Sequence, residues 1–113
     1  MDIREFKSEL ISRIKELFPE APVTAAEKRG TIIEVRADLS EKIFLEIYYN
    51  VLTGKKSYAL INQNERVYGC DNYRFWHIHP EHDPSQHIPC TEPSIKDVCS
   101  KMKQVYATVI APE

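Results

Sequence analysis

The first eighteen residues carry a helical pattern of apolar side chains. Asp2 stands at a position where its side chain can cap a helix, and Pro19 closes the stretch. Apolar residues recur between them at spacings of three and four: Ile3, Phe6, Leu10, Ile14, Leu17 and Phe18. The pattern therefore predicts an amphipathic helix at the start of the chain.

From Ile32 onward the pattern changes to alternation, which is typical of strands with one buried face. In segment 32–37, the apolar residues Ile33, Val35 and Ala37 fall on one side. Polar or glycine-containing turns separate the alternating segments that follow. The predicted strands are 32–37, 42–52, 56–62, 66–70 and 74–79. Short turns between consecutive strands predict an antiparallel five-stranded meander.

After His79 the chain is predicted to form a loop, because four prolines within fourteen residues exclude regular structure there. Pro93 and Ser94 then open a second helix. Its apolar stripe consists of Ile95, Val98, Cys99, Met102, Val105 and Tyr106. Packing the N-terminal and C-terminal helices on one face of the meander gives a single α+β domain over residues 1–113. The other sheet face is then available for function.

The composition of the chain argues against several functional classes. The chain has 113 residues and a formal charge of -2, so it lacks the basic field of a general nucleic-acid binder. Its three glycines are too far apart for a phosphate-binding loop. Its longest apolar run is four residues, far shorter than a membrane-spanning helix, so no membrane association is expected. An odd count of three cysteines fits a reducing compartment, which predicts a cytoplasmic location.

All four histidines fall within eleven residues, at His77, His79, His82 and His87, and Cys90 follows closely. If 74–79 is a strand, His77 and His79 project together from the open sheet face, while Trp76 and Ile78 point into the core. Imidazole accepts and donates protons near neutral pH. The pair is therefore a candidate acid and base for phosphodiester cleavage.

The same side chains also suit zinc. His77 and His79 with one loop histidine, His82 or His87, would form an open three-ligand site, and Cys90 would close it. The spacing matches no established zinc module, and solvated loop residues are the simpler interpretation of His82 and His87.

Neighbouring residues have two interpretations each. Asp71 belongs to a predicted turn, where it serves local hydrogen bonding, and it could also orient an imidazole. Arg74 could stabilise charge on a phosphate. Tyr48 and Tyr58, beside Arg66, could stack and neutralise single-stranded RNA, although tyrosines also simply favour strands.

Residues Lys56 to His87, about a third of the chain, resemble the small TumE-like proteins of prokaryotic toxin–antitoxin operons. The shared features are the Ser57-Tyr58 strand, a polar turn, a strand running into Asp71-Asn72, and the histidine cluster from His77. Family members carry adjacent histidine pairs, whereas Ile78 separates the pair here. The resemblance implies a toxin component that acts on RNA and is encoded beside a DNA-binding antitoxin.

These observations lead to two hypotheses. The first is a cytoplasmic toxin-like, metal-independent endoribonuclease without a cofactor, in which His77 and His79 are the acid–base pair, assisted by Arg74 and Asp71. The alternative is a small non-catalytic module that binds zinc or a protein partner. Its metal ligands would come from His77, His79, His82, His87 and Cys90.

Overall fold

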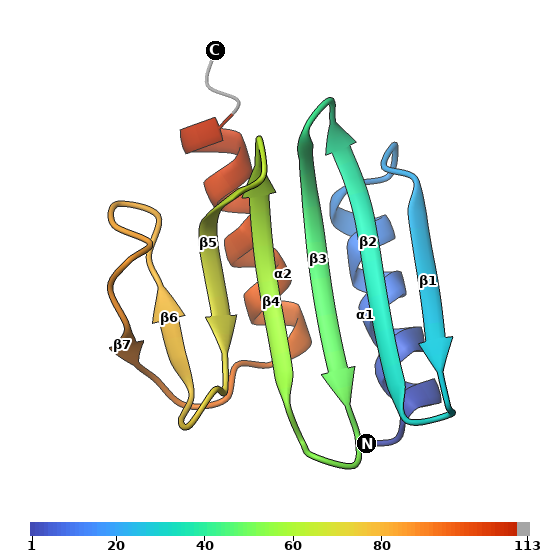
Figure 1. The fold of residues 1–113 in the computed structure, drawn as a ribbon. Coiled ribbons are helices and arrows are strands. Elements are labelled where there is room, and N and C mark those ends of the chain that lie inside the picture. Colours follow the sequence, from blue (N-terminus) through green and yellow to red (C-terminus); the bar gives the residue numbers. More distant parts are fainter. Residues whose placement is uncertain (111–113) are drawn as a thin grey trace.

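A computed structural model describes residues 1–110 as a seven-stranded antiparallel sheet with two helices (Figure 1). The helices are α1 (Ile3–Leu17) and α2 (Ile95–Val105), and a π-helical turn, η1 (Tyr106–Ile110), follows α2. The strands are β1 (Val23–Lys28), β2 (Ile32–Ser40), β3 (Ile43–Asn50), β4 (Lys56–Asn62), β5 (Glu65–Asp71), β6 (His77–His79) and β7 (Ile88–Pro89). Each strand pairs with the next one in the chain, so the sheet is a meander.

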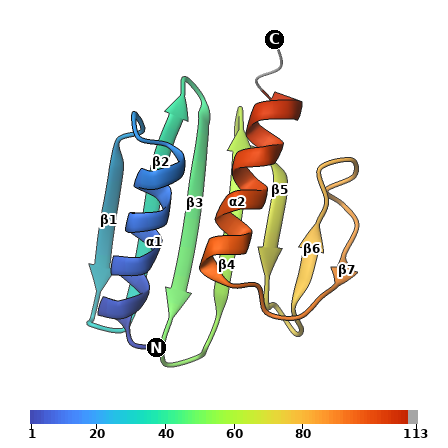
Figure 2. The same cartoon turned by 180° about the vertical axis from the view of Figure 1, so that it is seen from behind.

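Both helices lie on the same face of the sheet (Figure 2). Helix α1 begins at a capping box, in which Asp2 accepts from the Glu5 amide at 2.8 Å and the Glu5 carboxylate accepts from the Asp2 amide at 3.2 Å. The Ser94 hydroxyl accepts from the Asp97 amide at the start of α2. Helix α1 covers β1 to β3 and α2 covers β4 and β5, so β6 and β7 extend beyond the helices (Figure 2).

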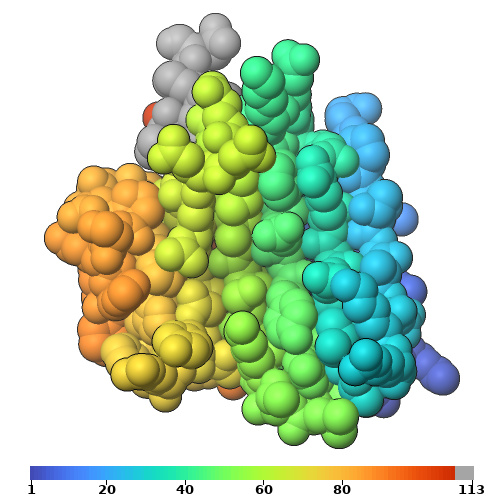
Figure 3. Space-filling model, viewed as in Figure 1, coloured from blue at the N-terminus to red at the C-terminus, as the bar shows by residue number. Residues whose placement is uncertain are grey.

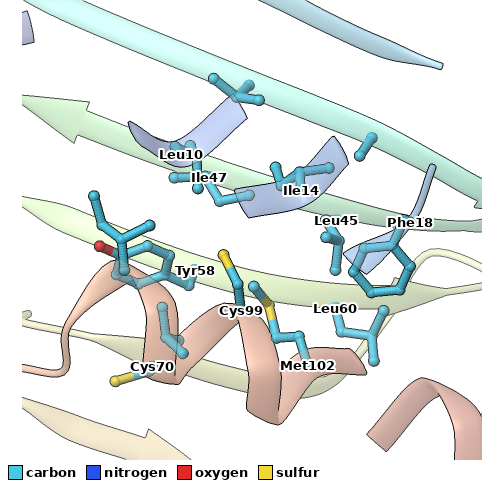
Figure 4. Close-up of a cluster of buried hydrophobic side chains, with 14 of the residues drawn as sticks. Leu10, Ile14, Phe18, Leu45, Ile47, Tyr58, Leu60, Cys70, Cys99 and Met102 are labelled. Atoms are coloured by element: carbon cyan, nitrogen blue, oxygen red, sulfur yellow. The ribbon is translucent and has the colours of Figure 1, made fainter. Parts of the chain in front are cut away.

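The hydrophobic core lies between the helices and the sheet (Figure 4). Leu10 and Ile14 of α1 face Leu45 and Ile47 of β3, and Met102 of α2 lies near β4 (Figure 4). The strands contribute alternate residues to the core, as the sequence pattern predicted. These buried strand residues are Ile33, Val35, Ala37, Leu45, Ile47, Tyr58, Leu60, Tyr68 and Cys70.

The predicted α+β class with an antiparallel sheet and two helices is confirmed, but the predicted number of five strands is wrong. Strand β1 has one half-buried residue and is otherwise exposed, so it carries no apolar alternation. Strand β7 is only two residues long and includes Pro89, which an edge strand tolerates. Strand β6 begins at His77 rather than Arg74, because Arg74 has a positive φ of 69° and belongs to a bend.

Trp76, which precedes β6, packs against the core as its predicted orientation requires, but it is only half-buried rather than enclosed under the helices. No helix within residues 1–110 has both the length and the apolar character needed to cross a membrane.

Two leucines provide a matched test of the core. Leu60 is fully buried, whereas Leu52 is 78% exposed in the turn between β3 and β4. Leu60→Ala should lower the free energy of unfolding by about 2–5 kcal/mol, because it leaves a cavity. Leu52→Ala should change it by less than about 0.5 kcal/mol. Urea unfolding followed by circular dichroism measures both, and equal effects would contradict the assignment of the core face.

Candidate metal centre

Strand register brings four polar side chains to one place on the uncovered face of the sheet. Asp71 pairs with His77 across β5 and β6, and His79 pairs with Gly69. In the β6–β7 hairpin His77 pairs with Pro89, so two steps further along the hairpin His87 stands opposite His79. Directly opposed residues point to the same side of a sheet. Asp71 and the three histidines therefore gather on this face.

The ring nitrogens and the carboxylate converge. The Nε2 atoms of His77 and His79 lie 3.1 Å apart. Asp71 Oδ1 is 3.1 Å from His77 Nε2, and Asp71 Oδ2 is 2.9 Å from His79 Nε2. The His87 ring centroid lies 4.9 Å from that of His77 and 4.7 Å from that of His79. One ring nitrogen from each of the three histidines falls within 4.8 Å of the others.

The opposite ring nitrogens face backbone carbonyls. His77 Nδ1 lies 2.9 Å from the Phe75 oxygen, and His79 Nδ1 lies 3.2 Å from the Pro84 oxygen. A carbonyl oxygen only accepts, so these contacts favour a hydrogen on Nδ1 and a lone pair on Nε2. Histidines that ligate metals characteristically donate their second N–H to a carbonyl or carboxylate in this way.

Arg66 reaches the same cluster because of a β-bulge. The register between β4 and β5 shifts after Leu60, which adds Val67 as an extra residue and turns Arg66 to the uncovered face. There its Nη2 lies 3.2 Å from His79 Nδ1. Guanidinium only donates, so this contact favours the other tautomer of His79, in which Nε2 donates to Asp71. Two hydrogen-bonding states thus compete at His79.

Gly69 makes room for both neighbours. A Cβ at this position would lie 2.8 Å from Arg66 Cδ and 3.4 Å from His79 Cδ2. The glycine therefore permits the Arg66 side chain to cross β5 and approach the imidazole.

The prediction that His77 and His79 project from an open sheet face is wrong about their exposure. They are 5% and 3% exposed, because the segment between β6 and β7 folds back over them and contributes the Pro84 carbonyl. Burial lowers the pKa of His79; the hydrogen bond to Asp71 opposes this effect, and the Arg66 charge adds to it. A lowered pKa keeps this imidazole neutral at pH 7, which is the form that binds a metal.

A pocket of about 470 Å³ opens beside the cluster. We call it the site pocket; its lining residues are Lys55, Ser57, Arg66, Asp71, Tyr73, His77, His79 and His87. It lies on the sheet face seen in Figure 3, where the orange atoms of the β6–β7 segment stand beside the yellow atoms of β5. A larger depression of about 720 Å³ follows the outer side of α1, and charged residues and serines line it.

The other expected ligands and binding residues lie elsewhere. Among residues 1–110, the group close enough to hold one ion is His77, His79 and His87; Asp71, which contacts the first two, lies outside it, as do His82 and Cys90. Cys90 packs against the helix-facing core. Arg74 lies over the Tyr73 ring at 5.5 Å, outside the lining of the site pocket. Tyr58 is 2% exposed in the core and so cannot stack a ligand on the opposite face.

The sequence favoured a solvated loop position for His87 and did not point to Lys55 or Gly69. The hairpin register would have placed His87 in the site, because the short strand β7 after the loop brings His87 back beside His79. Strand β7 has only two residues, which is too short for an alternation of apolar and polar residues to reveal it in the sequence. Arg66 was expected to bind RNA. Its contact with His79 depends on a β-bulge, which the sequence pattern does not predict.

Comparison of the chain with protein-family models, with curated proteins and with solved structures gives no significant match. The resemblance to TumE-like proteins stays a prediction.

Gly69→Ala tests the two states of His79. The added methyl should push Arg66 away from His79, so that the Pro84 carbonyl becomes the only partner of Nδ1. The variant should fold with a stability change of about 1 kcal/mol or less, since Arg66 is a flexible side chain. Nitrogen-15 NMR of the metal-free imidazoles should then show the proton moving from Nε2 to Nδ1. Arg66→Ala should produce the same change, and unaltered His79 resonances in both variants would contradict this account.

Proposed function

We propose that the protein binds a divalent transition metal, zinc foremost, through His77, His79, His87 and Asp71. One observation carries the proposal: two buried Nε2 atoms and a carboxylate face one another at 2.9–3.1 Å. In a tetrahedral zinc site with bonds of about 2.0–2.1 Å, neighbouring ligand atoms lie about 3.3 Å apart. The three groups are thus spaced nearly as the edges of such a site.

The arrangement calls for a cation. With hydrogens on both Nδ1 atoms, the lone pairs of the two buried Nε2 atoms and the charge of the half-buried Asp71 point toward one another, and Arg66 Nη1 lies 3.9 Å from Asp71. Burying such groups without a compensating positive charge is costly. A proton shared with Asp71 can compensate, as in the Arg66-bound state of His79, and so can a metal ion. Imidazole and carboxylate ligands suit zinc among the common divalent metals.

The four ligands differ in accessibility. His77 and His79 are buried, whereas His87 is exposed at the side of the site pocket. Four protein ligands would fill a tetrahedral zinc ion, as in structural sites, whereas binding by the three histidines alone would leave one position for water. In that case the ion would polarise the bound water, which is the basis of hydrolytic zinc chemistry.

Metal content tests the proposal directly. Protein purified without an affinity tag and loaded with zinc should hold close to one equivalent by elemental analysis. Removing the metal with a chelator should lower the melting temperature, because an ion that binds only the folded state stabilises it by about 2.7 kcal/mol at 100 times its dissociation constant. Protein that binds no metal, with the same melting curve in zinc and in chelator, would remove the proposal.

The two loop histidines supply a matched comparison. His79→Ala should weaken zinc binding by more than about 100-fold, since even outer hydrogen-bond partners of ligands are worth about 10–100-fold. His87→Ala should also weaken binding, whereas His82→Ala should leave it unchanged, because His82 lies outside the cluster. Competition with a chromophoric chelator measures all three. Equal affinities of the His87 and His82 variants would exclude His87 as a ligand.

The metal-independent endoribonuclease expected from the sequence uses the same side chains. The close hydrogen bonding of His77, His79 and Asp71 supports a proton relay among them. An acid and a base that act on a phosphodiester must reach oxygens on opposite sides of the phosphorus, however, and Nε2 atoms only 3.1 Å apart are poorly placed for that. This geometry favours the metal centre as the leading proposal.

Chelation separates the two proposals in one assay. RNA cleavage by a histidine pair should continue in excess chelator, whereas cleavage at the metal centre should stop and return with added zinc. Growth arrest on expression, relieved by a neighbouring DNA-binding antitoxin, would support the toxin proposal. Protein that neither arrests growth nor cleaves RNA in either condition would remove the endoribonuclease.

A further inference from the structure

The site pocket is positively charged within an acidic chain. Lys55 and Arg66 line it together with the carboxylate of Asp71, while the whole chain carries a formal charge of -2. A divalent ion at the histidines would add two further positive charges. Clefts lined by one sign of charge concentrate ligands of the opposite sign. The pocket therefore suits an anionic group.

Two exposed aromatic rings lie near these positively charged groups. Tyr73 lines the site pocket and is 61% exposed, and Phe75 is 52% exposed with its ring centroid 5.2 Å from that of His77. Apolar rings so exposed beside a cationic pocket are typical of sites that stack nucleic-acid bases.

The pocket continues across the sheet. A second hollow of about 310 Å³, which we call the sheet hollow, shares Lys55 and Ser57 with the site pocket and extends to Tyr48. Lys55 Nζ lies 5.6 Å from the centroid of the Tyr48 ring. A ligand could thus place an anionic group between the two hollows and a flat ring on each side. Glu34 and Glu46 line the sheet hollow too, and they disfavour a long phosphate track.

From these features we propose that the site pocket binds a short stretch of single-stranded nucleic acid, with a phosphate between Lys55 and the metal centre and a base on Tyr73. The inference rests on the proposed metal centre, which supplies part of the positive charge. Phosphate contacts give affinity, and stacking selects unpaired bases, because the rings of a duplex are not free to reach Tyr73.

Fluorescence anisotropy with a labelled hexanucleotide of 2′-O-methyl ribose, which resists cleavage, tests the proposal on zinc-loaded protein. Tyr73→Ala should weaken binding about fivefold or more, and Tyr73→Phe should restore it, because stacking uses the ring and not the hydroxyl. Lys55→Ala should weaken binding and reduce the slope of log affinity against log salt by about 0.7, the effect of one lost phosphate contact. Lys96→Ala, on the exposed side of α2, should behave as the wild type.

Zinc content is measured on the same samples, so that failure of the metal centre and failure of this inference are distinguishable. Variants at Lys55 and Tyr73 should keep one equivalent of zinc, since neither belongs to the ligand set. The inference would be overturned if zinc-loaded protein bound the hexanucleotide no better than inorganic phosphate. It would also be overturned if the Lys55→Ala and Tyr73→Ala variants bound the hexanucleotide as tightly as the wild type. A duplex of the same sequence that binds as tightly as the single strand would also overturn it.

Discussion

The contact between Asp71 and the imidazoles of His77 and His79 is the constraint on which the rest of the site depends. Two buried imidazoles meet the half-buried carboxylate of Asp71, and each of their ring nitrogens already has a partner. Removing water from such groups is unfavourable unless their lone pairs meet a proton or a metal ion. Arg66, whose Nη1 lies 3.9 Å from Asp71 Oδ2, supplies one positive charge beside the cluster, and the proposed metal ion would supply more.

The position of the cluster follows from the shape of the fold. The helices cover β1 to β5 and leave β6 and β7 beyond them (Figure 2). A sheet edge offers free backbone groups and little apolar cover, so short strands and prolines are common there. Here the same proline-rich segment limits the edge and supplies the Pro84 carbonyl that orients His79. Protection of the edge and construction of the site are thus one structural feature.

Periodicity predicted most of the fold because core residues such as Val35, Ile47 and Leu60 alternate in the sequence as they do in the sheet. It could not predict β1, whose residues are mostly exposed, or β7, which is too short to show a period. The histidine strand was placed on the correct face but wrongly assigned to solvent, because its burial comes from the segment that follows it. Tyr58 shows the same difficulty: residue type alone does not tell which layer a side chain contacts.

Arg66 connects the histidine cluster to the site pocket beside it. When its guanidinium donates to His79 Nδ1, the imidazole must carry its hydrogen on Nε2, where a metal would bind. Metal binding instead requires a hydrogen on Nδ1, which then donates to Pro84 and leaves Arg66 facing another donor. The two hydrogen bonds at Nδ1 exclude each other, so an ion bound at Nε2 under the proposed function would displace Arg66 from the ring. Since Arg66 also lines the site pocket, both its charge and that of the ion would then be open to an anion there.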